Sequence, residues 1–175
     1  MHAMEDQVTL VDENDREIGV EGKMAAHRSG KLHRAISVFI FDSAGRLLLQ
    51  KRAAGKYHSA GLWSNTCCSH PRHGEHRLAA AHRRLQEEMG LACELQEVFS
   101  FVYRAELSND LIENEYDYVF FGHYEGVPQP DPEEVEDWKW ADMALLKKDL
   151  QTNPQAYTFW LAACIDRVIS CKEPV

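Results

Sequence analysis

Three histidines and two glutamates stand at spacings that could bring their side chains to one metal ion. His27 and His33 flank the loop before the first strongly apolar segment, and His70 follows a pair of cysteines. Glu113 and Glu115 are two residues apart, so on a strand both carboxylates point to one face. Such a set suits Mn²⁺, Fe²⁺ or Zn²⁺ better than Mg²⁺, which prefers oxygen ligands. Taken singly, each histidine is more often a surface or core residue, and the glutamate pair is typical of a solvated edge strand.

A charged segment at residues 75–89 has the periodicity of a helix. The residues that recur at spacings of four, three and four, and so lie on one face of this helix, are Leu78, His82, Leu85 and Met89. Arg83 and Glu87 lie four residues apart, as do Arg84 and Glu88, so each pair shares a helix face. On this pattern alone, both pairs are equally well explained as weak surface ion pairs.

The same helix resembles the Nudix box, which has a glycine, then a glutamate, then Arg-Glu-apolar-x-Glu-Glu-x-Gly-apolar at fixed spacing. The positions in register are Glu75, Arg83, Leu85, Glu87, Glu88, Gly90 and Leu91. Two positions depart, because Ser69 replaces the first glycine and Arg84 replaces the first glutamate of the helix. Nudix hydrolases use that glutamate cluster to hold Mg²⁺ ions that activate water against a diphosphate. A positively charged arginine at this position predicts a protein that keeps the Nudix fold but does not hydrolyse diphosphates. Arg84 is then expected to bind the oxygens of a diphosphate.

Other motifs resemble those of the type I isopentenyl-diphosphate isomerases. The run Trp-Ser-Asn-Thr-Cys-Cys-Ser-His-Pro at residues 63–71 is similar to that family's Trp-[Thr/Ser]-Asn-[Ser/Thr]-x-Cys-x-His-Pro segment. The further matching segments are residues 112–115 for Glu-Asn-Glu, 103–105 for Tyr-Arg-Ala, and 23–27 and 32–33 for the first two histidine positions. The resemblance extends from about Thr9 to Trp160, which is most of the chain.

This resemblance implies an isomerase that interconverts isopentenyl and dimethylallyl diphosphate. One proton is added to an alkene carbon and another is removed from the far allylic carbon, through a tertiary carbocation. Such chemistry needs two proton-transfer groups on opposite faces and no nucleophilic water. By the match, Cys68 is the catalytic thiol, Glu115 is the second acid–base group, and Tyr103 hydrogen-bonds into the proton relay. Because neighbours on a strand point to opposite faces, Cys67 is expected to be a small buried hydrophobe.

The resemblance also implies where substrate and metals bind. The basic residues around the diphosphate are Lys23, Arg52, Lys56 and Arg84, and the π face of Trp160 stabilises the cation. A Mn²⁺- or Zn²⁺-type site comprises His27, His33, His70, Glu113 and Glu115. A Mg²⁺ ion on the diphosphate is held by Glu88 and the backbone of Cys68, whereas Glu87 is structural. The interval from His27 to His33 is one residue shorter than in the family, so the first loop is expected to reach the metal differently.

The elements that must position these residues follow from hydrophobic periodicity. Strands are predicted at residues 8–11, 18–20, 35–41, 47–50, 62–68, 97–104, 113–124 and 137–141. Helices are predicted at 75–89, 144–150 and 154–170, and residues 23–30 form a loop or a short helix. The expected fold is α/β (α+β), a Nudix-like mixed β-sheet sandwiched by helices. It forms a single domain over residues 1–175, with its core at about 9–160.

Composition limits the partners of the chain. The formal net charge of -9 argues against general nucleic-acid binding but permits a locally basic pocket. No apolar run approaches the about 20 residues of a membrane span, and residues 1–6 lack the features of a signal peptide. Five cysteines without a CxxC pair argue against a disulfide framework and against a zinc knuckle. We therefore expect a cytoplasmic protein; nothing in the sequence fixes its oligomeric state, and a monomer is the default expectation.

Two alternative functions stay open at this point. A Nudix-type hydrolase of a nucleoside or other diphosphate is disfavoured by Arg84, and it would release phosphate or a nucleoside monophosphate. A non-catalytic metal-binding module is disfavoured by Cys68 and Glu115, because binding alone needs no proton donor on two faces.

Overall fold

The computed structural model describes residues 6–172, so most of the segment 1–6, where we expect no signal peptide, lies outside the described residues. In chain order the elements are β1 (Gln7–Val11), β2 (Glu17–Gly22), α1 (Lys23–Ser29), β3 (His33–Phe41), β4 (Leu47–Arg52), β5 (Trp63–Ser64), β6 (Cys67–Ser69), α2 (Arg77–Met89), β7 (Leu95–Glu106), η1 (Ser108–Asp110), β8 (Ile112–His123), β9 (Val135–Ala141), α3 (Met143–Thr152), η2 (Pro154–Ala156) and α4 (Phe159–Cys171). No helix within residues 6–172 is long and apolar enough to cross a membrane.

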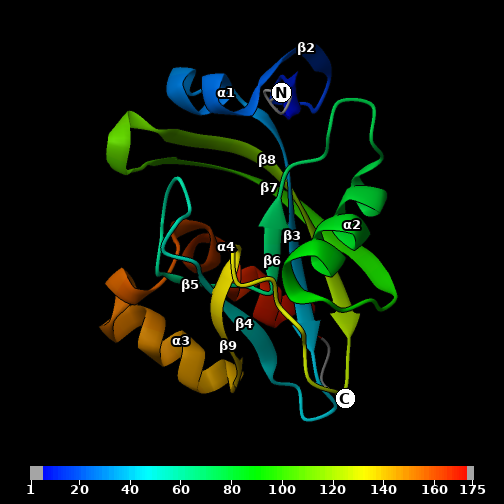
Figure 1. Ribbon diagram of the computed structural model, residues 1–175, viewed down its shortest axis with the longest axis vertical. Helices are drawn as coiled ribbons and strands as arrows, with labels where there is room; N and C mark the ends of the chain where they lie inside the picture. Colours follow the sequence, from blue (N-terminus) through cyan, green and yellow to red (C-terminus); the bar gives the residue numbers. More distant parts are fainter. Residues whose placement is uncertain (1–5, 173–175) are drawn as a thin grey trace.

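The strands join in one mixed sheet, as predicted. Within the described part of the chain its main path is β2-β1-β3-β4-β5, with β6 and β8 also paired to β3, β7 to β8, and β9 to β4. The strands β3 and β8 run parallel with His33 opposite Glu115, whereas the other pairs are antiparallel. The long β7–β8 hairpin extends beyond the rest of the sheet toward α1 (Figure 1).

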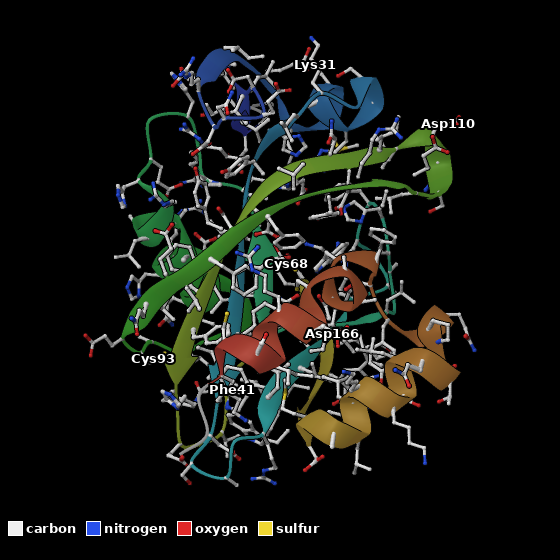
Figure 2. All side chains as sticks on the ribbon, turned by 180° about the vertical axis from the view of Figure 1, so that it is seen from behind. Lys31, Phe41, Cys68, Cys93, Asp110 and Asp166 are labelled. Atoms are coloured by element: carbon white, nitrogen blue, oxygen red, sulfur yellow. The ribbon has the colours of Figure 1, made fainter. Side chains whose placement is uncertain are left out.

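Helices cover both faces of the sheet, which confirms the predicted sandwich. One face of β3, with Val38 and Ile40, packs against Leu85 and Met89 of α2. The opposite face, with Phe39, packs in a second core that includes residues of α3 and α4. Figure 2 shows α4 lying across this second face. Alternation along the strand therefore sends successive side chains of β3 into two separate cores.

The strands β3 and β4 pair directly only where Phe41 lies opposite Leu47. Further along, the side chains of Asn65 and Thr66, here called the wedge, lie between the two strands. The buried Thr66 hydroxyl donates to the Leu48 carbonyl at 2.6 Å and accepts from the Ile40 amide at 3.0 Å. Asn65 Nδ2 donates to the Val38 and Cys67 carbonyls at 3.1 and 2.9 Å. These bonds replace part of the missing ladder and keep the backbone satisfied where the sheet opens.

Two predicted elements are wrong because residues within them form hydrogen bonds with backbone groups far along the chain. The expected strand at residues 62–68 is two short strands, β5 and β6, separated by the wedge of Asn65 and Thr66. The expected helix at 154–170 is a short turn, η2, followed by α4, since the Thr158 amide donates to the Trp63 carbonyl at 2.9 Å. The first long helix begins at Arg77, where His76 caps it, rather than at residue 75. Residues 23–29 form the short helix α1.

Candidate active site and metal centre

The predicted histidines converge on one carboxylate. Glu115 Oε1 lies 2.8 Å from His70 Nε2, 3.5 Å from His33 Nε2 and 3.9 Å from His27 Nε2. The ligand atoms of these four residues all lie within 4.8 Å of one another. Strands β3 and β8 place His33 directly opposite Glu115, α1 brings His27, and His70 follows the end of β6. The shorter interval from His27 to His33 thus still brings both rings together, with centroids 4.9 Å apart.

The chemistry of these side chains fits a divalent metal ion. The Nδ1 atoms of His27 and His33 lie 2.7 and 2.9 Å from the carbonyls of Lys23 and Lys31, to which they can donate. That tautomer leaves a lone pair on each Nε2, and neither Nε2 has a hydrogen-bond partner among residues 6–172. Burial lowers the pKa of His27 and of His70 to about 4, so both rings are neutral near pH 7. Neutral imidazoles are the form that binds metals.

Tyr103 ties the two glutamates together. Its hydroxyl lies 2.5 Å from Glu115 Oε2 and 2.8 Å from Glu113 Oε2. Burial raises the pKa of Tyr103 well above its ordinary value, so the phenol stays protonated and donates. Burial alone would raise the pKa of Glu115, but the imidazoles of His70 and His33 beside it hold that pKa well below its usual range. Glu115 is therefore a carboxylate that has a protonated phenol beside it.

The two adjacent cysteines point to opposite sides, as alternation predicts. Cys67 is fully buried in the core beneath α2, whereas Cys68 lines the cavity. Cys68 Sγ lies 3.5 Å from Ser64 Oγ and 3.6 Å from Asn65 Oδ1. Burial raises the pKa of Cys68 to about 12, so its sulfur carries a proton at neutral pH. Figure 2 places Cys68, on strand β6 of the sheet, near the centre of the molecule.

A cavity of about 200 Å³ brings the predicted residues together. Its walls include the predicted proton-transfer, basic and carboxylate residues Cys68, Tyr103, Glu115, Lys23, Arg52, Lys56, Arg84, Trp160, Glu88, His70 and Glu113. His27 and His33 do not line it, because both are fully buried behind the carboxylate of Glu115. One pocket thus presents a thiol, carboxylates and all four of the predicted basic side chains.

Arg84 fills the helical position where a Nudix hydrolase has a metal-binding glutamate. Its guanidinium donates to Glu87 at 2.6 Å and to Glu88 at 2.7 Å, and it lies 3.4 Å from Glu134. Lys56 also pairs with Glu134. The Arg84–Glu88 pair expected from the sequence therefore forms, but it faces the cavity rather than open solvent. The charge of Arg84 offsets part of the negative charge of these three carboxylates at one side of the cavity.

The neighbouring arginine has a different role. Arg83 makes a two-pronged ion pair with Glu75, at 2.7 and 2.9 Å, and only long contacts of 3.4 Å with Glu87. It ties the start of the Nudix-like segment to its helix. Such bidentate pairs fix geometry as well as charge.

Trp160 and Arg52 form the far wall. The indole Nε1 donates to Ser64 Oγ at 2.9 Å and to Asn65 Oδ1 at 3.1 Å, which fixes the ring. The guanidinium of Arg52 lies 5.3 Å from the ring centroid of Trp160. Residues that sequence reasoning missed in the site are Gln50, His58, Asp117 and Glu134. They carry no motif and enter the site only through contacts far along the chain.

Comparison with known proteins places the chain in a family. Residues 31–161 match the NUDIX domain model. Isopentenyl-diphosphate Delta-isomerase 1 of Aromatoleum aromaticum is 73% identical over 170 residues, covering 97% of this chain and 96% of that protein. The chain belongs to the isopentenyl-diphosphate Delta-isomerase family. The isopentenyl-diphosphate Delta-isomerase of Serratia proteamaculans is 54% identical over 157 residues, covering 90% of this chain and 88% of its own length.

Solved structures show that this isomerase family member has the fold of the wider NUDIX group. A Deinococcus radiodurans protein aligns with a TM-score of 0.80 at 19% identity, over 96% of this chain and all of that one. A MutT NUDIX hydrolase from Burkholderia pseudomallei aligns with a TM-score of 0.62 at 23% identity, over 78% of this chain and 98% of that one. At these identities the likeness concerns the fold alone.

Proposed function

We propose that the protein interconverts isopentenyl and dimethylallyl diphosphate, with Cys68 and Glu115 as its two proton-transfer groups. The observation that carries the proposal is that the Cys68 thiol, the Glu115 carboxylate and the Tyr103 hydroxyl line one cavity with the four predicted basic side chains. This arrangement occurs in a chain that is 73% identical to a protein named isopentenyl-diphosphate Delta-isomerase 1.

The reaction moves a double bond without gaining or losing atoms. One group donates a proton to the terminal alkene carbon, which leaves a tertiary carbocation. The other group removes a proton from the far allylic carbon, and that C–H pair becomes the new double bond. Because the reaction is reversible, Cys68 and Glu115 each act as acid in one direction and as base in the other. The Tyr103 hydroxyl, 2.5 Å from Glu115, serves the same relay.

The substrate's diphosphate is expected to bind at the basic side of the cavity. Arg84 and Lys56 both pair with Glu134, so their charges already face each other across a small space. The cationic side chains proposed to bind the diphosphate oxygens are Lys23, Arg52, Lys56 and Arg84. The indole of Trp160 presents a π face for the carbocation.

Two metal sites complete the proposal. The proposed ligands of a Mn²⁺- or Zn²⁺-type ion are His27, His33, His70, Glu113 and Glu115. A Mg²⁺ ion on the diphosphate would be held by Glu88 and the backbone of Cys68. Glu88 can take part because its two oxygens each accept one bond, from Arg84 and from Gln50 at 2.7 and 2.9 Å, and keep a further lone pair. When bound, the first ion tunes the acidity of Glu115 and the second neutralises phosphate charge.

The experiment that tests the proposal is proton NMR of the purified protein with isopentenyl diphosphate in D₂O, with Mg²⁺ and Mn²⁺ added. We expect dimethylallyl signals to grow with incorporation of deuterium, and no release of phosphate. Phosphate release without deuterated product would favour the Nudix-type hydrolase, which Arg84 disfavours. No turnover by a protein that holds its metal would favour a metal-binding module.

A further inference from the structure

A histidine outside the predicted metal site is also buried and lies beside that site. His58 stands in the loop between β4 and β5 and is 3% exposed. Its Nε2 atom lies 2.9 Å from Glu113 Oε1, and its Nδ1 atom lies 3.1 Å from Ser59 Oγ. Ser59 has a φ of +52°, a conformation that non-glycine residues rarely adopt. Both ring nitrogens are thus partnered, one of them by a residue in an unfavourable backbone conformation.

Two sets of side chains here have metal-ligand spacing, and they share an atom. One set is His27, His33, His70 and Glu115, and the other is His27, His58 and Glu113. His27 has its Nδ1 at the Lys23 carbonyl, so only its Nε2 can enter either set. One lone pair binds one ion, so the two sets cannot be filled together. The second set is therefore not an independent metal site.

Hydrogen bonding decides which set takes the ion. The set with Glu115 holds two imidazole nitrogens that lack a hydrogen-bond partner within the described residues, Nε2 of His27 and Nε2 of His33, whereas Nε2 of His58 already contacts Glu113 at 2.9 Å. A carboxylate that binds a metal ion is in turn held by outer partners, and that is the place left for His58. The ion is therefore expected to bind among His27, His33 and His70, and His58 is expected to contact a ligand of the ion rather than the ion itself.

We infer that His58 is a positioning residue that orients Glu113 toward the metal ion; this rests on the proposed role of Glu113 as a ligand. Glu113 Oε1 lies 2.9 Å from His58 Nε2, and Oε2 lies 2.8 Å from the Tyr103 hydroxyl, which has one proton and is nearer to Glu115 at 2.5 Å. A polar neighbour at each oxygen fixes the plane of the carboxylate, and His58 is the neighbour that Glu113 does not share with Glu115. Without His58 the carboxylate is held at one end only.

His58 also links this carboxylate to the wall that faces the substrate. Its ring meets the Trp160 indole edge-on, with centroids 5.8 Å apart and an interplanar angle of 89°. Its backbone carbonyl accepts from Arg52 Nη2 at 3.2 Å. A single residue therefore touches a proposed metal ligand, the proposed cation-stabilising ring and a proposed diphosphate-binding arginine.

The test is Mn²⁺ titration of the metal-stripped protein, with free Mn²⁺ measured by electron paramagnetic resonance. We expect His58→Ala to bind one ion per chain about 10–100-fold more weakly than wild type. His58→Gln, whose amide can donate to Glu113, is expected to recover most of that loss. The matched control is His73→Ala, because His73 makes the same kind of pair with Glu17, at 3.0 Å, on the surface. Its affinity should equal that of wild type.

Circular dichroism of each variant shows whether it is folded. Unchanged affinity in folded His58→Ala would overturn the inference, and so would loss of the ion from His58→Gln, which would make His58 a ligand. If His58→Ala does not fold, the Mn²⁺ affinities of His58→Gln and His58→Asn are compared instead. The shorter amide of asparagine is not expected to reach Glu113, so His58→Asn should bind Mn²⁺ more weakly than His58→Gln. Equal affinities of these two variants would overturn the inference. A wild-type protein that binds no Mn²⁺ would instead remove the proposed metal site itself.

Discussion

One face of the sheet changes character halfway along its strands. The polar half comprises His33, Ser37, Glu113, Glu115 and Asp117 of β3 and β8, and the apolar half comprises Phe39, Phe41, Val119 and Phe121 of the same strands. In Figure 2, β3 runs from near Lys31 at the top to Phe41 at the bottom, with Cys68 beside it between the two ends. All of these residues are buried except Phe121, which is partly buried, so the contrast concerns chemistry rather than exposure.

The two halves are held by different forces. In the apolar half, aromatic side chains pack against α4, and this burial stabilises the fold. The polar half buries three carboxylates, and burial raises the pKa of Asp117 well above its ordinary value. Ser37 donates to one oxygen of Asp117 at 2.6 Å, while the other oxygen has no partner among the described residues. The comparison indicates that the apolar half stabilises the fold, whereas burial of three carboxylates in the polar half costs stability.

The largest expected effect on stability comes from the apolar half. Phe39→Ala is expected to lower the free energy of unfolding by about 3–5 kcal/mol, because it leaves a cavity in a fully buried core. Ser37→Ala, two residues away in the polar half, should cost only about 1–3 kcal/mol through the unpaired Asp117. Urea denaturation of both variants measures this. Equal losses would remove the distinction between the halves.

The polar half should gain stability from a metal ion. Adding Mn²⁺ at 100 times its dissociation constant should raise the free energy of unfolding of the stripped protein by about 2.7 kcal/mol, because the ion binds only the folded state. His70→Ala should lose most of this increment, since His70 lies 2.8 Å from Glu115. Thermal unfolding with and without Mn²⁺ provides the measurement. An increment in His70→Ala as large as in wild type would contradict a metal centre on these residues.

A smaller effect is expected where the sheet opens. Thr66→Val replaces the bridging hydroxyl by a methyl group and leaves the Ile40 amide and the Leu48 carbonyl unpaired, at a cost of about 1–3 kcal/mol. Thr66→Ser keeps the hydroxyl and should cost less than Thr66→Val. Chemical denaturation of the two variants compares them directly. If Thr66→Ser and Thr66→Val lowered the free energy of unfolding equally, the contribution of Thr66 to stability would come from packing and not from its hydrogen bonds.

Local patterns were enough to predict the mixed sheet, the helix at α2 and the opposite directions of Cys67 and Cys68. These features depend on periodicities of two and 3.6 residues that are written into short segments. The predicted strand at 62–68 and helix at 154–170 failed because Thr66 and Thr158 bind backbone groups far along the chain. His58 was missed for the same reason, because its partner Glu113 becomes a neighbour only when the chain has folded.

The roles of the site residues came from motif resemblance and could not have come from pattern alone. A histidine such as His33 looks the same in a sequence whether its ring lies in a core or at a metal. What separates these cases is the free Nε2 atom beside Glu115, which depends on the register of β3 and β8. The pairing of Arg84 with Glu88 was predictable from helical spacing, but its position in the cavity was not.

The most direct test of the central claim compares Cys68→Ala with Cys67→Ala in the deuterium-incorporation assay. The account predicts that Cys68→Ala loses at least about 10²–10⁴-fold in turnover, as expected for removal of a proton-transfer group. Cys67→Ala should keep near wild-type turnover, since its side chain faces the core beneath α2. A fully active Cys68→Ala protein would contradict the assignment of the polar half as the site of proton transfer.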